Sequence, residues 1–261
     1  MFPDAVRAVT CNSNLGFRNR PLSSCAKLVL FTTIISAGFT ANGAGAADTF
    51  DVGGDVTLAT DYMFRGVSQT MSAASVHACL EVAHDSGLSA YLWASNVDFV
   101  ADGDPDDGAR VEMDLMLGYT RALSDRFTAS AGLVRYFFPG TRPGFDYDYS
   151  EWIGSLTIDD RHSLSLGYAP DVFGAGESGV YVSVATSFDL PGDLLLSAEI
   201  GHYDLEAAYG ESYRHGSVGI SRSVDAFTWQ LSYHVTDNNA RNLFYESIVA
   251  PKLVLSLNLS L

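Results

Sequence analysis

Two residues of the sequence have the types and spacing of a serine hydrolase pair. His215 and Ser217 are separated by one residue, so on a strand both side chains lie on the same face. A general base also needs an orienting third group, yet the positions about a dozen residues further on carry Trp229 and Gln230 rather than a carboxylate. The remaining histidines show no metal-ligand spacing: His77, His84, His162 and His202. We therefore predict no enzyme, metal or cofactor, and keep a barrel-borne hydrolase as the minor alternative.

A run of acids at 102–108 has the types of residue that could bind a divalent cation. Asp102, Asp104 and Asp106 place oxygens at alternate positions, as at the start of a calcium loop. Asp107, however, stands where that loop needs its glycine, and Met113 stands where it needs its bidentate glutamate. The pattern favours a solvated acidic loop, with weak Ca²⁺ or Mg²⁺ binding at the cell surface left open.

A third group of polar side chains alternates with apolar ones along the chain. If the apolar positions face lipid, the opposite face lines an aqueous lumen. Carboxylates predominate on that face, and carboxylates concentrate cations. We therefore expect a conducting lumen to favour small cations, with Arg65, Arg110 and Arg135 neutralising part of the charge. The predicted lumen-lining residues are Asp61, Arg65, Glu81, Asp98, Arg110, Glu112, Asp114, Glu151, Glu199, Gln230 and His234.

The elements that would hold these residues are short alternating segments. In 110–120, Val111, Leu115 and Leu117 alternate with Glu112 and Asp114, and a leucine stripe runs through 253–261. About twelve such segments can be drawn, each near the length that crosses a bilayer as a tilted strand. They are 55–65, 74–84, 88–99, 110–120, 126–138, 148–158, 162–169, 178–188, 193–203, 212–222, 226–236 and 253–261.

The connections between these segments alternate between short and long. The short ones, such as 85–87 and 189–192, carry the Gly, Pro and Asp of tight turns, whereas the long ones reach twelve residues at 237–248. Outer-membrane barrels alternate short periplasmic turns with longer outer loops. Lipid also favours closure, because an open sheet edge leaves backbone groups unpaired in hydrocarbon. The predicted fold class is all-β, a transmembrane antiparallel up-and-down β-barrel of about twelve strands.

The first 47 residues differ from the rest of the chain. Arg7, Arg18, Arg20 and Lys27 precede the apolar run 28–39, which is followed by small residues up to Ala47. That order predicts a signal peptide at 1–47, cleaved after Ala46 or Ala47, and a barrel at 48–261. The predicted mature chain has 11 Lys and Arg against 30 Asp and Glu, which argues against nucleic acid as a partner.

Two stretches resemble a known family. The segment 55–69, DVTLATDYMFRGVSQ, looks like the first strand and loop of the TorF-type porins. LWASNVDF at 92–99, the acidic loop and EMDLMLGY at 112–119 are similar to that family's next block, in the same order. The resemblance implies an outer-membrane location and a pore. Leu261 departs from the aromatic residue that usually ends such barrels.

Together these observations predict a porin-like channel of the bacterial outer membrane for passive diffusion of small solutes or ions. The expected partners are outer-membrane lipid and lipopolysaccharide, small solutes or ions, and the barrel assembly machinery. A non-conducting structural or surface-binding barrel stays open as the alternative.

Overall fold

The chain folds as a closed barrel of twelve antiparallel strands. This computed structural model describes residues 50–101 and 103–261, so the predicted signal peptide at 1–47 lies outside the described residues. The barrel strands are β1 (Phe50–Ala59), β4 (Ser75–His84), β5 (Leu88–Asn96), β6 (Val111–Ala122), β7 (Phe127–Phe137), β8 (Tyr149–Ile158), β9 (His162–Ala169), β10 (Gly179–Leu190), β11 (Leu194–Asp204), β12 (Tyr213–Val224), β13 (Phe227–Thr236) and β14 (Lys252–Ser260).

Alternation along each strand gives the barrel an apolar outside and a polar inside. On β6, Leu115 and Leu117 are exposed on the outer surface, while Glu112 and Asp114 point inward and are buried. The same holds on β14, where the predicted leucine stripe faces outward. Closure pairs the backbone of every barrel strand on both sides, as hydrocarbon requires. Within the part of the chain that the structure describes, no helix is long and apolar enough to cross a membrane.

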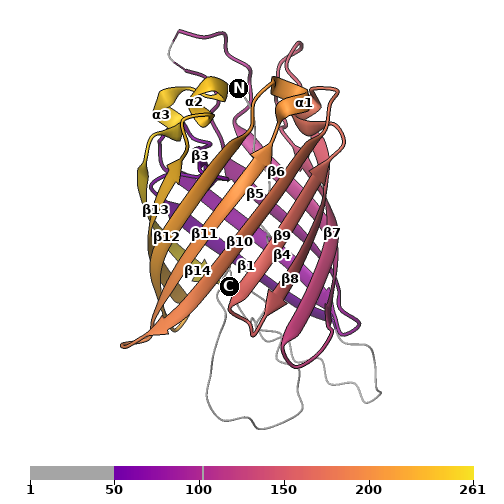
Figure 1. Cartoon of the computed structure of the whole chain (residues 1–261), viewed down its shortest axis with the longest axis vertical. Coiled ribbons are helices and arrows are strands. Elements are labelled where there is room, and N and C mark those ends of the chain that lie inside the picture. Colours follow the sequence, from indigo (N-terminus) through magenta and orange to yellow (C-terminus); the bar gives the residue numbers. More distant parts are fainter. Residues whose placement is uncertain (1–49, 102) are drawn as a thin grey trace.

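Short turns gather at one end of the barrel and long loops at the other (Figure 1). The turn end carries connections such as 85–87 and 159–161, and also holds the carboxyl terminus. The loop end carries four short helical segments: η1 (Val172–Gly174), α1 (Glu206–Tyr209), α2 (Ala240–Leu243) and α3 (Glu246–Val249). The alternation of short and long connections thus agrees with the prediction from sequence.

The first predicted segment, 55–65, has the wrong bounds. Strand β1 begins at Phe50 and ends at Ala59, because the chain turns away from the wall at Thr60. The residues that continue the alternating pattern form a separate hairpin, β2 (Met63–Phe64) and β3 (Val67–Ser68), at the loop end. We call residues 61–70 the arginine hairpin, because Arg65 lies at its tip. Asp61 and Arg65 therefore reach the interior from a loop rather than from the barrel wall.

The seam between the first and last strands, β1 and β14, has fewer residue pairs than any other pair of neighbouring strands in the barrel. Strand β1 forms five residue pairs with β14, from Asp55↔Ser260 to Ala59↔Ser256, but ten with β4. Side chains add contacts across this seam. Asn258 Nδ2 donates to Asp55 Oδ1 at 2.9 Å and to Thr57 Oγ1 at 2.7 Å. At the loop end, Lys252 Nζ donates to Ser72 Oγ at 2.5 Å.

Candidate functional site: the arginine hairpin and the polar lumen

The tip of the arginine hairpin is a two-residue turn in the left-handed region. Phe64 pairs with Val67, and the intervening Arg65 and Gly66 have φ angles of 44° and 82°. This is the φ pattern of a type I′ turn, which matches the twist of a hairpin. A non-glycine residue held there costs about 1–2 kcal/mol, so other contacts must hold Arg65 in place.

Those contacts surround the guanidinium of Arg65. Its Nη2 donates to Glu151 Oε1 at 2.9 Å, and neither side chain is exposed to solvent. The guanidinium carbon lies 3.7 Å from the ring centroid of Tyr181 and 4.1 Å from that of Tyr203. Arginine is well suited to such a site because its planar group pairs with a carboxylate and stacks on aromatic rings together. Tyr136 adds a hydroxyl bond to Glu151 Oε2 at 3.3 Å.

The hairpin spans the interior of the barrel. It leaves the wall at the end of β1, whereas its contacts at the tip lie on β8, β10 and β11. Around the ring, β4 to β7 separate β1 from β8 on one side, and β14 to β12 separate it from β11 on the other. The tip therefore contacts the wall opposite its origin.

Glycines in the wall make room for this cluster. A Cβ at Gly167 would lie 2.5 Å from Glu151 Oε1 and 3.0 Å from Arg65 Nη2. A Cβ at Gly201 would meet His215 Nε2 and the Tyr181 hydroxyl, and one at Gly66 would lie 2.6 Å from His215 Cβ. Glycine inside a strand often marks such a close approach. Strand-interior glycines are thus the signal in the sequence that points to the cluster, and alternation of polar and apolar residues does not reveal it.

The base of the hairpin is held by its own hydrogen bonds. Asp61 Oδ1 accepts from Ser68 Oγ at 2.6 Å and from Thr70 Oγ1 at 3.0 Å. The backbone N–H of Gln69 donates to the carbonyl of Tyr62 at 2.8 Å. Burial raises the pKa of Asp61, and the two hydroxyl donors oppose that rise. Both ends of the hairpin are thus fixed.

A polar cavity of about 240 Å³ lies beside the hairpin. Serine is the most frequent residue type in its walls, two threonines add further hydroxyls, and Glu199 contributes a partly exposed carboxylate. Tyr181 donates its hydroxyl proton to Glu199 Oε1 at 2.9 Å and also lies 2.9 Å from His215 Nε2. The polar lining is Asp55, Thr57, Asp61, Arg65, His77, Ser163, Ser165, Tyr181, Ser183, Ser197, Glu199, His215, Ser217, Ser221, Thr228, Gln230, Ser232, His234, Ser256 and Asn258.

The predicted lumen residues fall into three groups. Those at or near this cavity are Asp61, Arg65, Glu199, Gln230 and His234. Those buried at inward-facing positions of other strands are Glu81 on β4, Glu112 and Asp114 on β6, and Glu151 on β8. Asp98 and Arg110 lie instead in the loop between β5 and β6, where their side chains are about half exposed.

Aromatic residues fill the loop end of the interior. Phe137, Phe227 and Trp229 are exposed on the outer surface, as expected of residues at a membrane interface. Tyr62, Phe64 and Tyr149 are buried instead, in a cluster that also contains Phe138 and Tyr147. This cluster surrounds the arginine hairpin with apolar contacts, which strengthens the polar interactions at its tip.

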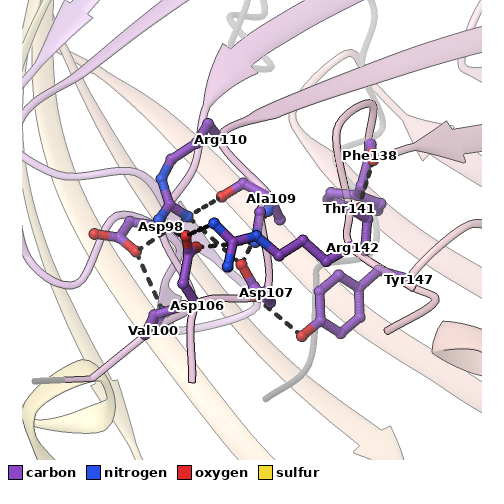
Figure 2. Close-up of polar contacts among 11 residues, drawn as sticks. Asp98, Val100, Asp106, Asp107, Ala109, Arg110, Phe138, Thr141, Arg142 and Tyr147 are labelled. Carbon is purple, nitrogen blue, oxygen red and sulfur yellow. Dashed lines mark hydrogen bonds and ion pairs between the residues drawn. The ribbon is translucent and has the colours of Figure 1, made fainter. Parts of the chain in front are cut away.

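The acidic loop uses its described carboxylates within the protein (Figure 2). Asp106 bridges two arginines, with Oδ1 2.7 Å from Arg110 Nη2 and Oδ2 2.5 Å from Arg142 Nη2. The buried Asp107 accepts from the backbone N–H of Ala109 at 2.9 Å and from the Tyr147 hydroxyl at 3.1 Å. A hydrogen bond from the Gly108 N–H lowers the pKa of Asp106, and both arginines act in the same direction. These contacts order the described part of the loop through arginine.

The two residues of the hydrolase alternative both point inward from β12. His215 is engaged with the Tyr181 hydroxyl, which already donates its proton to Glu199, so the His215 nitrogen acts as the donor. This contact orients His215 toward Tyr181 and the tip of the arginine hairpin. Across residues 50–101 and 103–261, no cluster of three or more His, Cys, Asp or Glu side chains could hold a metal ion.

Comparisons with known proteins agree with this architecture. The solved structure titled "KdgM porin" aligns with a TM-score of 0.50 at 8% identity, covering 80% of this chain and 98% of that one. The "NanC porin" structure aligns with a TM-score of 0.52 at 10% identity, covering 79% and 98%. A comparison with curated proteins finds no sequence match.

A closed antiparallel barrel with an apolar exterior is the architecture of the bacterial outer membrane, and the protein is an outer-membrane β-barrel of porin-like fold. The narrower resemblance to TorF-type porins stays a prediction. The family profile that matches the sequence is described as "Bacterial protein of unknown function (Gcw_chp)" and covers residues 43–259, so the chain belongs to the Gcw_chp family.

Proposed function

We propose that the protein is a passive diffusion channel of the outer membrane for small solutes or ions, with a preference for cations. The observation that carries this proposal is a hydroxyl-lined cavity of about 240 Å³ within a closed barrel, with carboxylates among its lining residues. Hydroxyls exchange hydrogen bonds with water and polar solutes at little cost. Such a lining suits passage better than tight binding.

The charge of the interior supports the cation preference. Inward positions of the strands carry Asp55, Glu81, Glu112, Asp114, Glu151 and Glu199. Among the described strands, Lys252 at the loop end of β14 is the one lysine or arginine in register with inward positions, and its ammonium is bonded to Ser72 and Ser247. Arg65 pairs with Glu151. A surplus of carboxylates raises the local concentration of cations and repels anions.

The two aligned structures that are called porins support the channel role by shared fold. Their identities of 8% and 10% establish the fold alone, so a transport role for this chain is part of the proposal. The TorF-type resemblance at 55–69 and 92–119 supports the same role.

Conductance of the purified protein in a planar bilayer tests this proposal. We expect stable conductance, and reversal potentials in a KCl gradient that indicate cation preference. Glu112→Gln combined with Asp114→Asn should weaken that preference, and Glu199→Gln should weaken it independently. Glu177→Gln, an exposed carboxylate in the loop between β9 and β10, is the matched control and should change nothing.

Three results would count against the proposal. A folded wild-type protein without conductance would favour the non-conducting barrel. Anion preference in the wild type would contradict the cation selectivity. An unchanged reversal potential in both carboxylate variants would remove these acids from the selectivity mechanism.

A further inference from the structure

We propose that the arginine hairpin is the constriction that limits the size of permeating solutes, and that Arg65 is the specificity-determining residue that fixes it. This inference rests on the proposed channel function and adds to it the element that sets the width of the path. The carrying observation is that a loop leaving β1 contacts β8, β10 and β11 on the opposite wall.

Three wall residues contact the tip, and two of them, Glu151 and Tyr181, have further hydrogen bonds of their own. Glu151 receives Arg65 on one oxygen and the Tyr136 hydroxyl on the other. Tyr181 donates to Glu199 and contacts His215. The packing face of Tyr203 lies 4.1 Å from the Arg65 guanidinium carbon. Because Glu151 and Tyr181 are held by hydrogen bonds and Tyr203 packs against the rings of Tyr181 and Tyr213, the guanidinium enters a prepared position on the wall opposite β1.

Arg65 is the side chain that secures the tip to the far wall. Apart from this residue, the tip consists of Gly66, which has no side chain to anchor and packs against His215. The base, held through Asp61, Ser68 and Thr70, lies near β1 and would stay in place without Arg65. Loss of the guanidinium should therefore free the tip while the base remains attached.

The space left by the hairpin indicates the class of solute. An apolar cavity of about 150 Å³ holds one benzene molecule, so the 240 Å³ beside the hairpin fits one small solute or a partly hydrated ion. Since Arg65 is committed to Glu151, the charges that a solute meets there are carboxylates, of which Glu199 is partly exposed while Asp55 and Asp61 are buried. The expected solutes are small cations and small neutral polar molecules, with oligomeric solutes excluded.

The experiment compares the wild type with Arg65→Ala and Glu151→Gln by single-channel conductance and by exclusion of polyethylene glycols of graded size. Arg126→Ala is the matched control, because it removes an ion pair with Asp159 at the exposed turn end. Heat-modifiable gel mobility shows that each variant is folded. Should Arg65→Ala fail to fold, the nearly isosteric Glu151→Gln still removes the charge that holds the tip.

Arg65→Ala should raise conductance about twofold or more and admit larger glycols, since pore dimensions govern passage. Glu151→Gln should raise conductance by less, and Arg126→Ala should leave it unchanged. If the wild type conducts, and Arg65→Ala and Glu151→Gln have the same conductance and glycol exclusion, the hairpin is not the constriction, but the channel function stands. If the wild type does not conduct but Arg65→Ala does, the proposed channel function is wrong, whereas the hairpin does obstruct the lumen. If folded protein conducts in neither form, both proposals fail.

Discussion

Arg65 combines three features at one position, namely a left-handed backbone, a buried charge and stacking on two aromatic rings. Each of the first two is unfavourable alone. A buried guanidinium is tolerated because Glu151 compensates its charge and the tyrosine faces replace part of its hydration. The strain at φ 44° is in turn compensated by those contacts. Because Arg65 and its partners depend on one another, the losses of stability caused by substituting them singly should not add up in a double variant.

The first prediction concerns this dependence. Glu151→Ala should destabilise the barrel by about 3–5 kcal/mol, because it leaves Arg65 buried without its partner. Arg65→Ala combined with Glu151→Ala should cost less than the sum of the two single changes. Unfolding by urea in lipid vesicles measures all four members of this cycle. Strict additivity would mean that the two residues do not act as a pair.

The second prediction uses a matched pair of glycines. Gly167→Ala should destabilise by about 1–3 kcal/mol, because the new methyl group overpacks the cluster, with Glu151 Oε1 only 2.5 Å from the ideal Cβ. Gly154→Ala is the control, since its Cβ would meet only Ser130 O at an ordinary 3.7 Å. The same urea titration compares them. Equal stability of the Gly167→Ala and Gly154→Ala variants would show that the structure around Gly167 accommodates a methyl group without loss of stability.

The barrel strands are the elements that sequence patterning predicts well. Alternation and turn residues placed eleven of the twelve strands close to their observed bounds, and β9 at 162–169 agrees at both ends. The pattern fails at β1 because Asp61, Met63 and Arg65 continue the alternation after the chain has left the wall at Thr60. Periodicity reports which side chains share a face, but it does not reveal that a strand has ended.

Candidate site residues are harder to predict, because a local pattern gives the face on which a side chain lies but not the distant residues that it contacts. The inward direction of Glu112, Glu151 and Glu199 follows from strand parity, which the sequence contains. The partnership of Arg65 with Tyr181 and Tyr203 joins residues more than a hundred positions apart, and no local pattern encodes it. Asp98 and Arg110 follow the strand pattern too, yet they belong to a loop ordered by ion pairs.

The third prediction tests the two faces of β14. Leu257→Arg should impair insertion by about 2–4 kcal/mol, because a charge on the lipid face near the midplane is unfavourable. Ser256→Arg should be tolerated better, since Ser256 lines the polar cavity. Folding yield in lipid vesicles compares the two variants. Similar losses would indicate that the face of β14 toward lipid has been assigned wrongly.

As a whole molecule, the protein presents lipid with an apolar belt and encloses an interior rich in polar and acidic residues. Every barrel strand has two neighbours, so its backbone bonds are shielded from detergent as well as from lipid. Packed aromatics and the arginine hairpin lie at the loop end of the interior, while the hydroxyl-lined region extends toward the turn end. The two ends of the interior are therefore lined by different kinds of residue.

The fourth prediction follows from closure. Unheated protein in sodium dodecyl sulfate should migrate faster than the boiled chain, and it should fractionate with the outer membrane. Sequencing its amino terminus checks the predicted start of the mature chain at Ala47 or Asp48. Recovery of the mature chain in the soluble periplasm would contradict the membrane assignment.

The seam between β1 and β14 also bears on how the barrel forms. It joins residues about as far apart as the chain allows, since the Asn258 side chain bonds Asp55 across 203 positions, and its ladder has only five pairs. Contacts of such separation form late because loop closure must come first. Asn258→Ala should therefore slow the appearance of the heat-modifiable form more than Ser130→Ala, whose hydroxyl bonds Ser155 only 25 positions away. Closure of this seam, and not formation of the hairpins, is then the rate-limiting step of barrel assembly.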